Sequence, residues 1–333
     1  MNKQRKYLLT DSKNYYKSNL HNHSTISDGA FTPEELKKLY MEKGYSVLAY
    51  TDHDILVAHH ELTDEKFVAL SGVELDINPN VEYHKGMKTC HIGFIALEQG
   101  NDFQPCYHRT KYCKERFAKN RHLVKFDDSL PDYEREYTGE CISDMMRIAR
   151  EKGFFVTYNH PTFSLEDYPI YMSYHNMNAM EIYNTVCELM GYDEHNGHIY
   201  DDKLRNGEKI YCIAADDTHG VNDIGGGFTM INADKLEYRE ITKALEDGNF
   251  YASEGPIINN LWYEDGTVHI ECEEAQQIFI TKGVRNSERK AVTNGYITEV
   301  DFNIIEEDIY FRITVVGKDG RKAYTNAYFV DEL

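Results

Sequence analysis

The segment Tyr45-Ser-Val-Leu-Ala-Tyr50 runs directly into Thr51-Asp-His-Asp54, so a short apolar run ends in residues that can bind metal or catalyse. A run of this length and composition is typical of a buried strand. The same sequence of events occurs four more times along the chain: His21-Asn-His23 after Tyr16–Leu20, Gly72-Val-Glu74 after Phe67–Ser71, Asn159-His160-Pro161 after Phe154–Tyr158, and Asp216-Asp-Thr-His219 after Ile210–Ala215. In parallel α/β folds the carboxyl ends of the strands meet at the active site. The pattern therefore predicts one site built from five strand ends.

Helical patterns lie between several of these strands. The clearest covers Pro33–Lys43, with Thr32 and Glu35 in a capping box and Gly44 as the stop signal. Further helices are predicted over Thr138–Lys152 and Leu236–Asp247, and further strands over Ile92–Leu97 and Ala179–Tyr183. The alternation of strand and helix predicts a parallel α/β fold, either a barrel or an open sheet.

Two segments depart from this alternation. Residues 100–140 are rich in His, Arg, Lys, Tyr and Asp, and are predicted to be an insertion of helices and loops near one barrel rim or a solvated surface excursion. After Gly255-Pro256 the pattern becomes alternating strands, such as Thr267–Glu271, Gln277–Thr281 and Tyr310–Val316, and Lys318-Asp-Gly320 predicts a hairpin. We therefore expect a barrel domain over residues 1–255, with its core at 18–255, and a small β-sandwich over 256–333.

Composition limits the partners and the compartment. The formal net charge of −20 disfavours long nucleic acids and anionic membranes, which need clustered Lys and Arg. Seven cysteines without a CxxC pair indicate reduced thiols in the cytoplasm. Neither a signal-peptide core nor a run of about 18 apolar residues is present in the sequence, so we expect no membrane span.

The residue types at the strand ends favour a metal site. Imidazole nitrogens combined with carboxylate oxygens suit zinc, manganese or iron, whereas a shell of oxygens alone would favour magnesium or calcium. A single His-x-His or Asp-x-His pair is a weak signal, but five such elements at five strand ends predict a site with several ions. Three acids beside them, Asp52, Asp54 and Asp216, are either second-layer carboxylates that orient imidazoles or solvated loop acids.

Taken in order, these motifs resemble the PHP (polymerase and histidinol phosphatase) superfamily. The resemblance rests on His21-Asn-His23, Ser27-Asp28-Gly29, Thr51-Asp-His53, Gly72-Val-Glu74, His91, Asn159-His160-Pro161 and Asp217-Thr-His219. Tyr251-Ala-Ser-Glu-Gly-Pro256 and the β-rich segment after it are more loosely similar to bacterial two-domain PHP-like phosphoesterases.

The resemblance implies a distorted (β/α)7 TIM-like barrel that holds three divalent ions. By position, one ion takes His21, His23, Glu74 and Asp217, a second shares Glu74 and adds His91 and His160, and a third takes Asp28, His53 and His219. His91 precedes its strand, so it reaches the site only if the chain makes an excursion and returns between Ile77 and Cys90. His84 is its rival.

The expected activity is that of a metal-dependent phosphoesterase with a small phosphorylated substrate, a mono- or diester and possibly a nucleotide. A metal-bridging hydroxide held by Glu74 and Asp217 would attack phosphorus. Two alternatives remain open: hydrolysis of a carboxyl or carbamate ester at the same site, and a non-catalytic, metal-stabilised binding module. The substrate-binding residues stay unassigned, because none of Lys85, Arg109, Lys111 and Arg205 is singled out.

Overall fold

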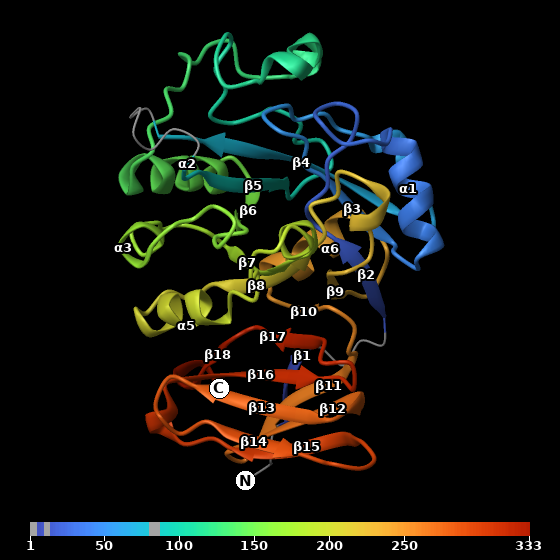
Figure 1. Ribbon diagram of the computed structural model, residues 1–333, viewed down its shortest axis with the longest axis vertical. Coiled ribbons are helices and arrows are strands. Elements are labelled where there is room, and N and C mark those ends of the chain that lie inside the picture. The colour runs from blue at the N-terminus through green and yellow to red at the C-terminus, as the bar shows by residue number, and fades with distance from the viewer. Residues whose placement is uncertain (1–4, 10–13, 80–86) are drawn as a thin grey trace.

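The computed structural model describes residues 5–9, 14–79 and 87–333. Within these residues the chain forms one sheet of fourteen strands and a second sheet of four. The described α-helices all precede residue 247, and β-strands dominate the remainder of the chain (Figure 1). No helix in the described ranges is long and apolar enough to cross a lipid bilayer.

Residues 14–253 form the part of the large sheet that carries the predicted strand ends. Its order is β9-β2-β3-β4-β5-β6-β7-β8, with β10 on the outer side of β9. The strands are β2 (Tyr15–Asn19), β3 (Val47–Tyr50), β4 (Val68–Ile77), β5 (Cys90–Ala96), β6 (Phe154–Asn159), β7 (Ala179–Asn184), β8 (Tyr211–Ala215), β9 (Phe228–Asn232) and β10 (Phe250–Ser253). Each predicted strand of this region is confirmed, with its ends shifted by a few residues.

The expectation of an all-parallel sheet is wrong at β5 and β9. The pairs β2/β3, β3/β4, β6/β7 and β7/β8 are parallel, but β5 and β9 are antiparallel to both of their neighbours. β5 returns directly beside β4, with Ile77 opposite Cys90, and antiparallel neighbours need no crossover helix. The large sheet is therefore mixed.

The two ends of this strand order meet in space. β8 lies against β9 and β10, although no backbone ladder joins it to either strand in the described residues. Instead, the Thr229 hydroxyl of β9 accepts a hydrogen bond from the Ala214 amide at 3.2 Å and donates one to the Ala214 carbonyl at 3.1 Å. The Thr229 side chain thus connects β8 to β9, although the described backbone does not close the sheet into a barrel.

The predicted helix starts and stops are confirmed. α1 (Pro33–Glu42) begins at the Thr32 capping box and is followed by Gly44 at φ +80°. The other α-helices are α2 (Gly139–Glu151), α3 (Tyr168–Tyr171), α4 (Thr185–Leu189), α5 (Gly197–Arg205) and α6 (Tyr238–Glu246). Short 3-10 helices are η1 (His60–Leu62), η3 (Glu115–Leu123), η4 (Val221–Asp223), η5 (Glu306–Asp308) and η6 (Val330–Glu332).

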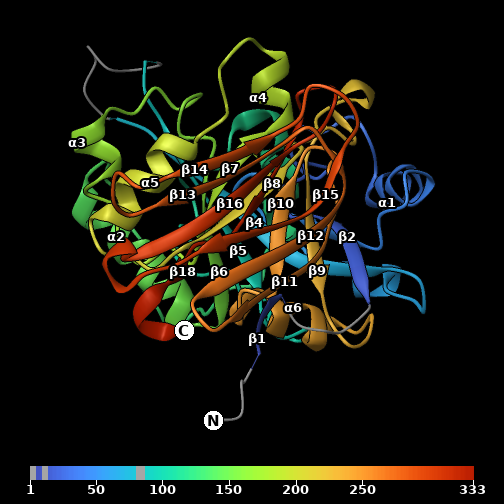
Figure 2. The same cartoon turned by 90° about the horizontal axis from the view of Figure 1, so that it is seen from below.

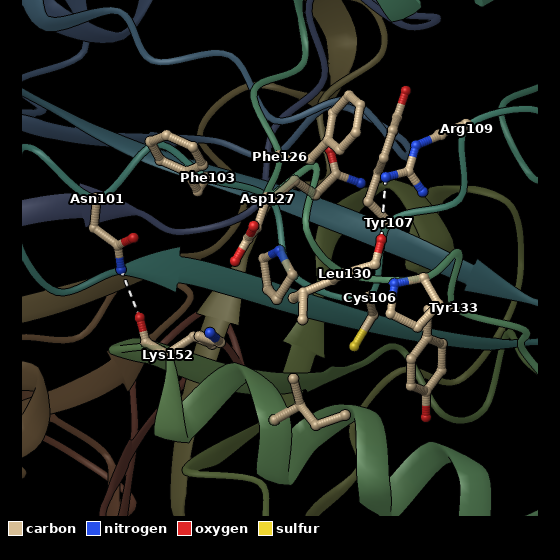
Figure 3. A pocket seen from close by; sticks show the side chains of 14 residues that line it. Asn101, Phe103, Cys106, Tyr107, Arg109, Phe126, Asp127, Leu130, Tyr133 and Lys152 are labelled. Atoms are coloured by element: carbon tan, nitrogen blue, oxygen red, sulfur yellow. Dashed lines mark hydrogen bonds between the residues drawn. The ribbon is translucent and has the colours of Figure 1, made fainter.

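Residues 100–138 form loops around the 3-10 helix η3, at the edge of the molecule farthest from the C-terminal strands (Figure 1). Phe117 and Val124 are buried there against Ile55, so this insertion packs on the loop that follows β3. Between the insertion and α2 lies a largely apolar cavity of about 500 Å³, shown in Figure 3 with Phe103, Tyr107, Phe126, Leu130 and Tyr133 among its lining. The insertion is therefore a packed element of the fold at the rim.

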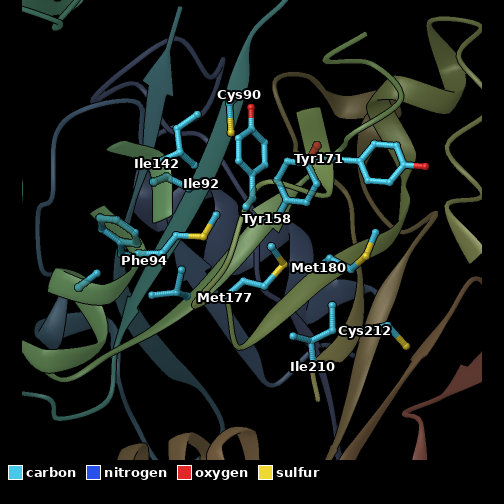
Figure 4. Close-up of a cluster of buried hydrophobic side chains, with 14 of the residues drawn as sticks. Cys90, Ile92, Phe94, Ile142, Tyr158, Tyr171, Met177, Met180, Ile210 and Cys212 are labelled. Atoms are coloured by element: carbon cyan, nitrogen blue, oxygen red, sulfur yellow. The ribbon is translucent and has the colours of Figure 1, made fainter. Parts of the chain in front are cut away.

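The outer face of β5–β8 packs against α2, α3 and α5 through a large apolar core (Figure 4). Ile92 and Phe94 from β5 and Met180 from β7 meet Ile142 of α2 and Tyr200 of α5, all with negligible exposure. Burial of each such side chain contributes about 1.5–3 kcal/mol to stability. This core fixes the positions of β5–β8. Predicted ligands lie in β5 and in the loops after β6 and β8.

The C-terminal strands build two facing layers, seen from below in Figure 2. One layer has the order β1-β11-β12-β15, and the other continues the large sheet as β14-β13-β16-β17, with β18 beside β16. Their bounds are β1 (Lys6–Leu9), β11 (Ile258–Glu264), β12 (Thr267–Ala275), β13 (Gln277–Lys282), β14 (Glu288–Ala291), β15 (Ile297–Asn303), β16 (Tyr310–Val316), β17 (Lys322–Thr325) and β18 (Tyr328–Phe329).

The predicted hairpin is confirmed, with Gly320 at φ +85° between β16 and β17. Leu261 and Ile270 of one layer share a buried core with Ile280 and Ile313 of the other. β17 also pairs with β10, so the large sheet runs without a break past Gly255-Pro256. The division of the chain into domains at residue 255 stays a prediction.

Candidate metal centre

All nine predicted ligands lie together at one end of the large sheet. The loop after β2 supplies His21, His23 and Asp28, and the loop after β3 supplies His53. The loop after β6 supplies His160, and the loop after β8 supplies Asp217 and His219. Glu74 and His91 differ from the expectation, because both lie inside strands: Glu74 is the seventh residue of β4 and His91 the second of β5. We call these nine residues, together with Asp76, the candidate metal centre.

The first group of ligand atoms comes from His21, His23, Glu74 and Asp217. The Nε2 atoms of His21 and His23 are 3.1 Å apart, and each lies 3.0–3.4 Å from Glu74 and from Oδ1 of Asp217. A zinc ion with bonds of about 2.0–2.1 Å has tetrahedral ligand edges of about 3.4 Å, so this spacing fits an ion. The two rings converge because His21–His23 lie beyond the last β2 residue, Asn19.

The second group differs from the one that the resemblance implies. His91 Nδ1 lies 3.3 Å from Glu74 Oε1, as required by the hairpin return of β5, and His84 lies outside the described residues. His160 Nε2 also approaches Glu74 Oε1, at 3.2 Å. However, the four residues whose atoms gather most closely here are His53, Glu74, Asp76 and His91.

Asp76 was missed by the sequence reasoning. Its Oδ1 lies 3.0 Å from both His53 Nδ1 and His91 Nε2. The signal was present in the sequence, since residues two apart in a strand point to the same face and Asp76 follows Glu74 by two.

The third group contains the predicted Asp28, His53 and His219, joined by His23. His219 Nε2 lies 3.4 Å from Asp28 Oδ1, while His53 Nε2 and His23 Nδ1 are each 3.8 Å from an Asp28 oxygen. This group is wider than the first, and the ring of His219 is about one third exposed. The three groups overlap at Glu74, His23 and His53, so they form one continuous cluster.

Unsatisfied polar atoms show that the cluster fits metal ions. In the described part of the chain, six buried side-chain atoms of the candidate metal centre have no hydrogen-bond partner: His23 Nδ1, His53 Nδ1, Glu74 Oε2, Asp76 Oδ1, His91 Nδ1 and Asp217 Oδ1. An unpaired buried polar group costs about 1–3 kcal/mol, and native proteins carry few of them. Ions bound between these atoms would satisfy them.

The electrostatics of the cluster also favour a bound cation. Burial disfavours a charged His23, but the nearby carboxylates of Asp217 and Glu74 outweigh it and raise the pKa of His23 to about 10. Burial likewise disfavours a charged His160, but the carboxylate of Glu74 outweighs it and raises the pKa of His160 to about 9. Burial works against a charged Glu74, yet the neighbouring imidazoles hold its pKa well below its usual range. Protons on the imidazoles therefore meet the demand for positive charge when no ion is bound.

Glu181 of β7 orients two of the predicted ligands and was also missed. Nδ1 of His21 donates to Glu181 Oε1 at 2.7 Å, which leaves Nε2 facing the cluster. The backbone amide of His160 donates to Glu181 Oε2 at 2.8 Å. A carboxylate on the outer nitrogen of a ligating imidazole fixes its ring and strengthens its bond to a metal. The signal in the sequence was a lone Glu within the apolar run Ala179–Tyr183.

The three acids beside the predicted ligands, Asp52, Asp54 and Asp216, support loops and do not orient imidazoles. Asp52 accepts hydrogen bonds from the amides and hydroxyls of Ser24 and Ser27. Asp54 is paired with the buried guanidinium of Arg135. None of these interactions reaches an imidazole of the cluster.

Asp216 is enclosed by Gly225-Gly-Gly227. Its carboxylate accepts from the amides of all three glycines and from the hydroxyls of Thr185 and Tyr40, at 2.7–3.0 Å. We call this arrangement the glycine cradle. It supports the loop that carries Asp217.

Two predicted ligands have strained backbones. His160 and Asp217 adopt φ values of +26° and +56°, in the left-handed region that side chains with a Cβ disfavour. Such conformations cost about 1–3 kcal/mol each and concentrate at functional sites. The strain turns both side chains into the cluster.

A cavity of about 300 Å³ opens onto the cluster. Its walls include the apolar side chains of Phe163, Val186 and Met190 and the cation Lys114. The basic candidates from the sequence lie elsewhere: Arg109, Lys111 and Arg205 are paired with Asp132, Glu134 and Asp202, and Lys85 is outside the described residues. Lys114 and Arg116 were missed because they belong to the insertion, whose position over the site the sequence did not reveal.

Comparison with known proteins agrees with the sequence motifs. No family model matches the chain. It is 38% identical over 89 residues to the 5'-3' exoribonuclease Rnm of Salmonella typhimurium, which is 27% of this chain and 30% of that protein. Rnm of Escherichia coli is 41% identical over 78 residues, 23% of this chain and 26% of its own length. The chain thus matches less than a third of the length of these relatives.

Solved structures align with the chain at low sequence identity. A two-domain protein from Bacteroides vulgatus that contains a predicted PHP-like metal-dependent phosphoesterase aligns with 98% of this chain and 100% of its own, at 14% identity and a TM-score of 0.47. An amidohydrolase from Chromobacterium violaceum covers 61% of this chain and 87% of its own, at 16% identity and a TM-score of 0.38. The resemblance to the PHP superfamily rests on the ordered motifs of the sequence.

Proposed function

We propose that this chain is a metal-dependent phosphoesterase that hydrolyses a small phosphorylated substrate at a site for three divalent ions. The observation that carries the proposal is the single cluster of His, Asp and Glu side chains with Glu74 at its centre. Its scaffold is a distorted (β/α)7 barrel over residues 1–255, and residues 256–333 form a small β-sandwich domain. The approach of β8 to β9 through Thr229 supports the barrel.

The ligand sets that we propose follow the three groups of atoms. His21, His23, Glu74 and Asp217 hold the first ion. Glu74, His91 and His160 hold the second, with Asp76 as an added candidate, and Asp28, His53 and His219 hold the third. Divalent ions in such a cluster lower the pKa of a bound water and neutralise charge on a phosphoryl group.

The chain's own residues contribute orientation and shielding. Glu181 fixes the ring of His21 and the backbone of His160, so that both imidazoles keep their positions. Phe163, Val186 and Met190 form an apolar wall of the cavity, which limits the water around the site. Restricted water strengthens each electrostatic interaction with a developing charge.

Phosphate esters are the favoured substrate class. The names of the relatives describe an exoribonuclease and, in Bacillus subtilis, a DNA polymerase/3'-5' exonuclease 38% identical over 82 residues, 19% of this chain and 14% of that protein. These names favour phosphoryl transfer over carboxyl-ester hydrolysis. The net charge of −20 favours a small substrate, or the end of a short strand, over a long duplex. Seven free thiols support a cytoplasmic location.

The test combines metal content with a substrate screen. The protein is loaded with zinc, manganese or iron and assayed against phosphate monoesters, a short oligonucleotide and carboxyl esters. We expect phosphate-ester turnover, and we expect His160→Ala to lose both bound metal and turnover. Wild-type metal content and turnover in His160→Ala would remove the assignment of this site. Activity on carboxyl esters alone would replace the proposed reaction with the alternative one, and metal binding without any turnover would favour a binding module.

A further inference from the structure

Lys114 stands apart from the other residues of the cavity that opens onto the candidate metal centre. Among the described lining residues it is the single Lys or Arg, and the remaining walls are the predicted ligands and apolar side chains. Its side chain is 43% exposed. The cavity therefore has one fixed cation at its entrance.

The insertion holds Lys114 firmly over the site. Lys114 is the N-cap of η3, and three residues later Phe117 is buried and stacks on His53, with ring centroids 6.4 Å apart. Asn120 Nδ2 donates to the Ile26 carbonyl at 2.8 Å, and Arg116 pairs with Asp28. Both anchors belong to loops that carry predicted ligands, so the lysine and the cluster keep a fixed relation.

Lys114 forms an ion pair with Asp76, which places its ammonium group beside the cluster. Nζ lies 2.6 Å from Asp76 Oδ2, and the other oxygen of Asp76 faces His53 and His91. Ions bound in the cluster would draw Asp76 towards themselves and would repel a neighbouring ammonium group. The Asp76 carboxylate lies between Lys114 and the cluster and offsets part of this repulsion, and a phosphate anion in the cavity would give the ammonium group a second acceptor.

We propose that Lys114 binds the phosphate group of the substrate. This inference rests on the proposed function and adds to it a specificity residue supplied by the insertion. A compact ammonium group suits a phosphate oxygen as a point-charge partner. The ligand class is a phosphate carried on a group small enough to pass the apolar wall of Phe163 and Met190.

The test measures binding of inorganic phosphate to the metal-loaded full chain by calorimetry, which requires no turnover. Lys114→Met is expected to weaken phosphate binding about 10- to 100-fold, because a hydrogen bond to a charged group is lost, while bound metal stays at the wild-type level. Lys114→Arg is expected to retain most of the affinity. Lys111→Met is the matched control, since Lys111 lies on the same segment but pairs with exposed Glu134.

The outcomes separate the two proposals. Unchanged phosphate affinity in metal-loaded Lys114→Met would overturn the inference and leave the proposed phosphoesterase intact. Loss of metal from Lys114→Met would also overturn it, because the lysine would then support the cluster instead of the ligand. If the metal-loaded wild type neither binds phosphate nor cleaves phosphate esters, the proposed function itself fails and the inference falls with it.

Discussion

The glycine cradle and the candidate metal centre are built around adjacent residues, Asp216 and Asp217, yet they treat a buried carboxylate in opposite ways. Asp216 accepts five hydrogen bonds from backbone amides and hydroxyls. Oδ1 of Asp217 has no hydrogen-bond partner in the described residues and faces the imidazoles of His21 and His23. Both side chains are almost fully buried, so burial does not distinguish them.

Structural and functional roles are thus separated within one loop. A buried carboxylate surrounded by enough donors is complete and stabilises the fold. A buried carboxylate that faces imidazoles and has an oxygen without a hydrogen-bond partner requires a cation. Asp216 therefore belongs to the scaffold, and Asp217 belongs to the proposed chemistry. The following predictions test that distinction.

Replacing Asp217 should have the largest effect on function. Asp217→Ala removes a proposed ligand of the first ion, so we expect the loss of at least one bound ion and a fall in turnover of about 1000-fold or more, equivalent to several kcal/mol of transition-state stabilisation. In the presence of a chelator its melting temperature should stay within a few degrees of the wild type. Metal analysis and phosphatase assays check this result, and full metal content with normal turnover would break the distinction.

Replacing Asp216 should instead reduce stability. Asp216→Ala leaves three glycine amides and two hydroxyls without their acceptor, and we expect the free energy of unfolding to fall by about 3 kcal/mol. The loss should be the same with and without a chelator, as measured by urea unfolding. A stability change that appears only in the metal-loaded protein would show that the cradle is part of the metal centre. The Asp217→Ala variant is the matched control for this measurement.

Glu181 contacts the ligand His21 but is not itself a proposed metal ligand, so its replacement separates ligand orientation from metal coordination. Glu181→Gln keeps the shape of the side chain but weakens the acceptor for Nδ1 of His21, and we expect metal affinity to fall by about 10- to 100-fold. A competition titration against a chelator measures this change, and excess metal should restore turnover. Failure of excess metal to restore turnover would indicate that Glu181 acts on more than ligand orientation.

Much of this arrangement was predictable from the sequence, because strand ends and ligand types are local patterns. His53 and His160, which follow β3 and β6 and lie beside Glu74, were predicted in this way, as were α1 and its Thr32 cap. Asp76 and Glu181 were missed, since strand lengths and the inward face of β7 depend on tertiary packing. The antiparallel β5 was missed for the same reason.

The sequence also could not place the insertion. Lys114 and Asp76 are 38 residues apart in the chain, and their 2.6 Å contact depends on how Phe117 packs beside His53. No local pattern encodes such a contact. The cradle was likewise hidden, because a triple glycine by itself is equally compatible with a mobile loop and with a wrapped carboxylate.

The smallest expected effect is a dependence of stability on pH to which the candidate metal centre contributes only when no metal is bound. The raised pKa values of His23, about 10, and His160, about 9, lie above the ordinary value near 6.5. Their contribution to stability is fully present below about pH 6.5 and is lost as the pH rises through 9–10, at no more than about 1.4 kcal/mol per pH unit for each proton. With a chelator present, the free energy of unfolding should therefore fall between pH 7 and 8. With metal bound, the imidazoles are deprotonated at neutral pH and this slope should become smaller, whereas a slope of equal size in both forms would place the titrating groups outside the centre.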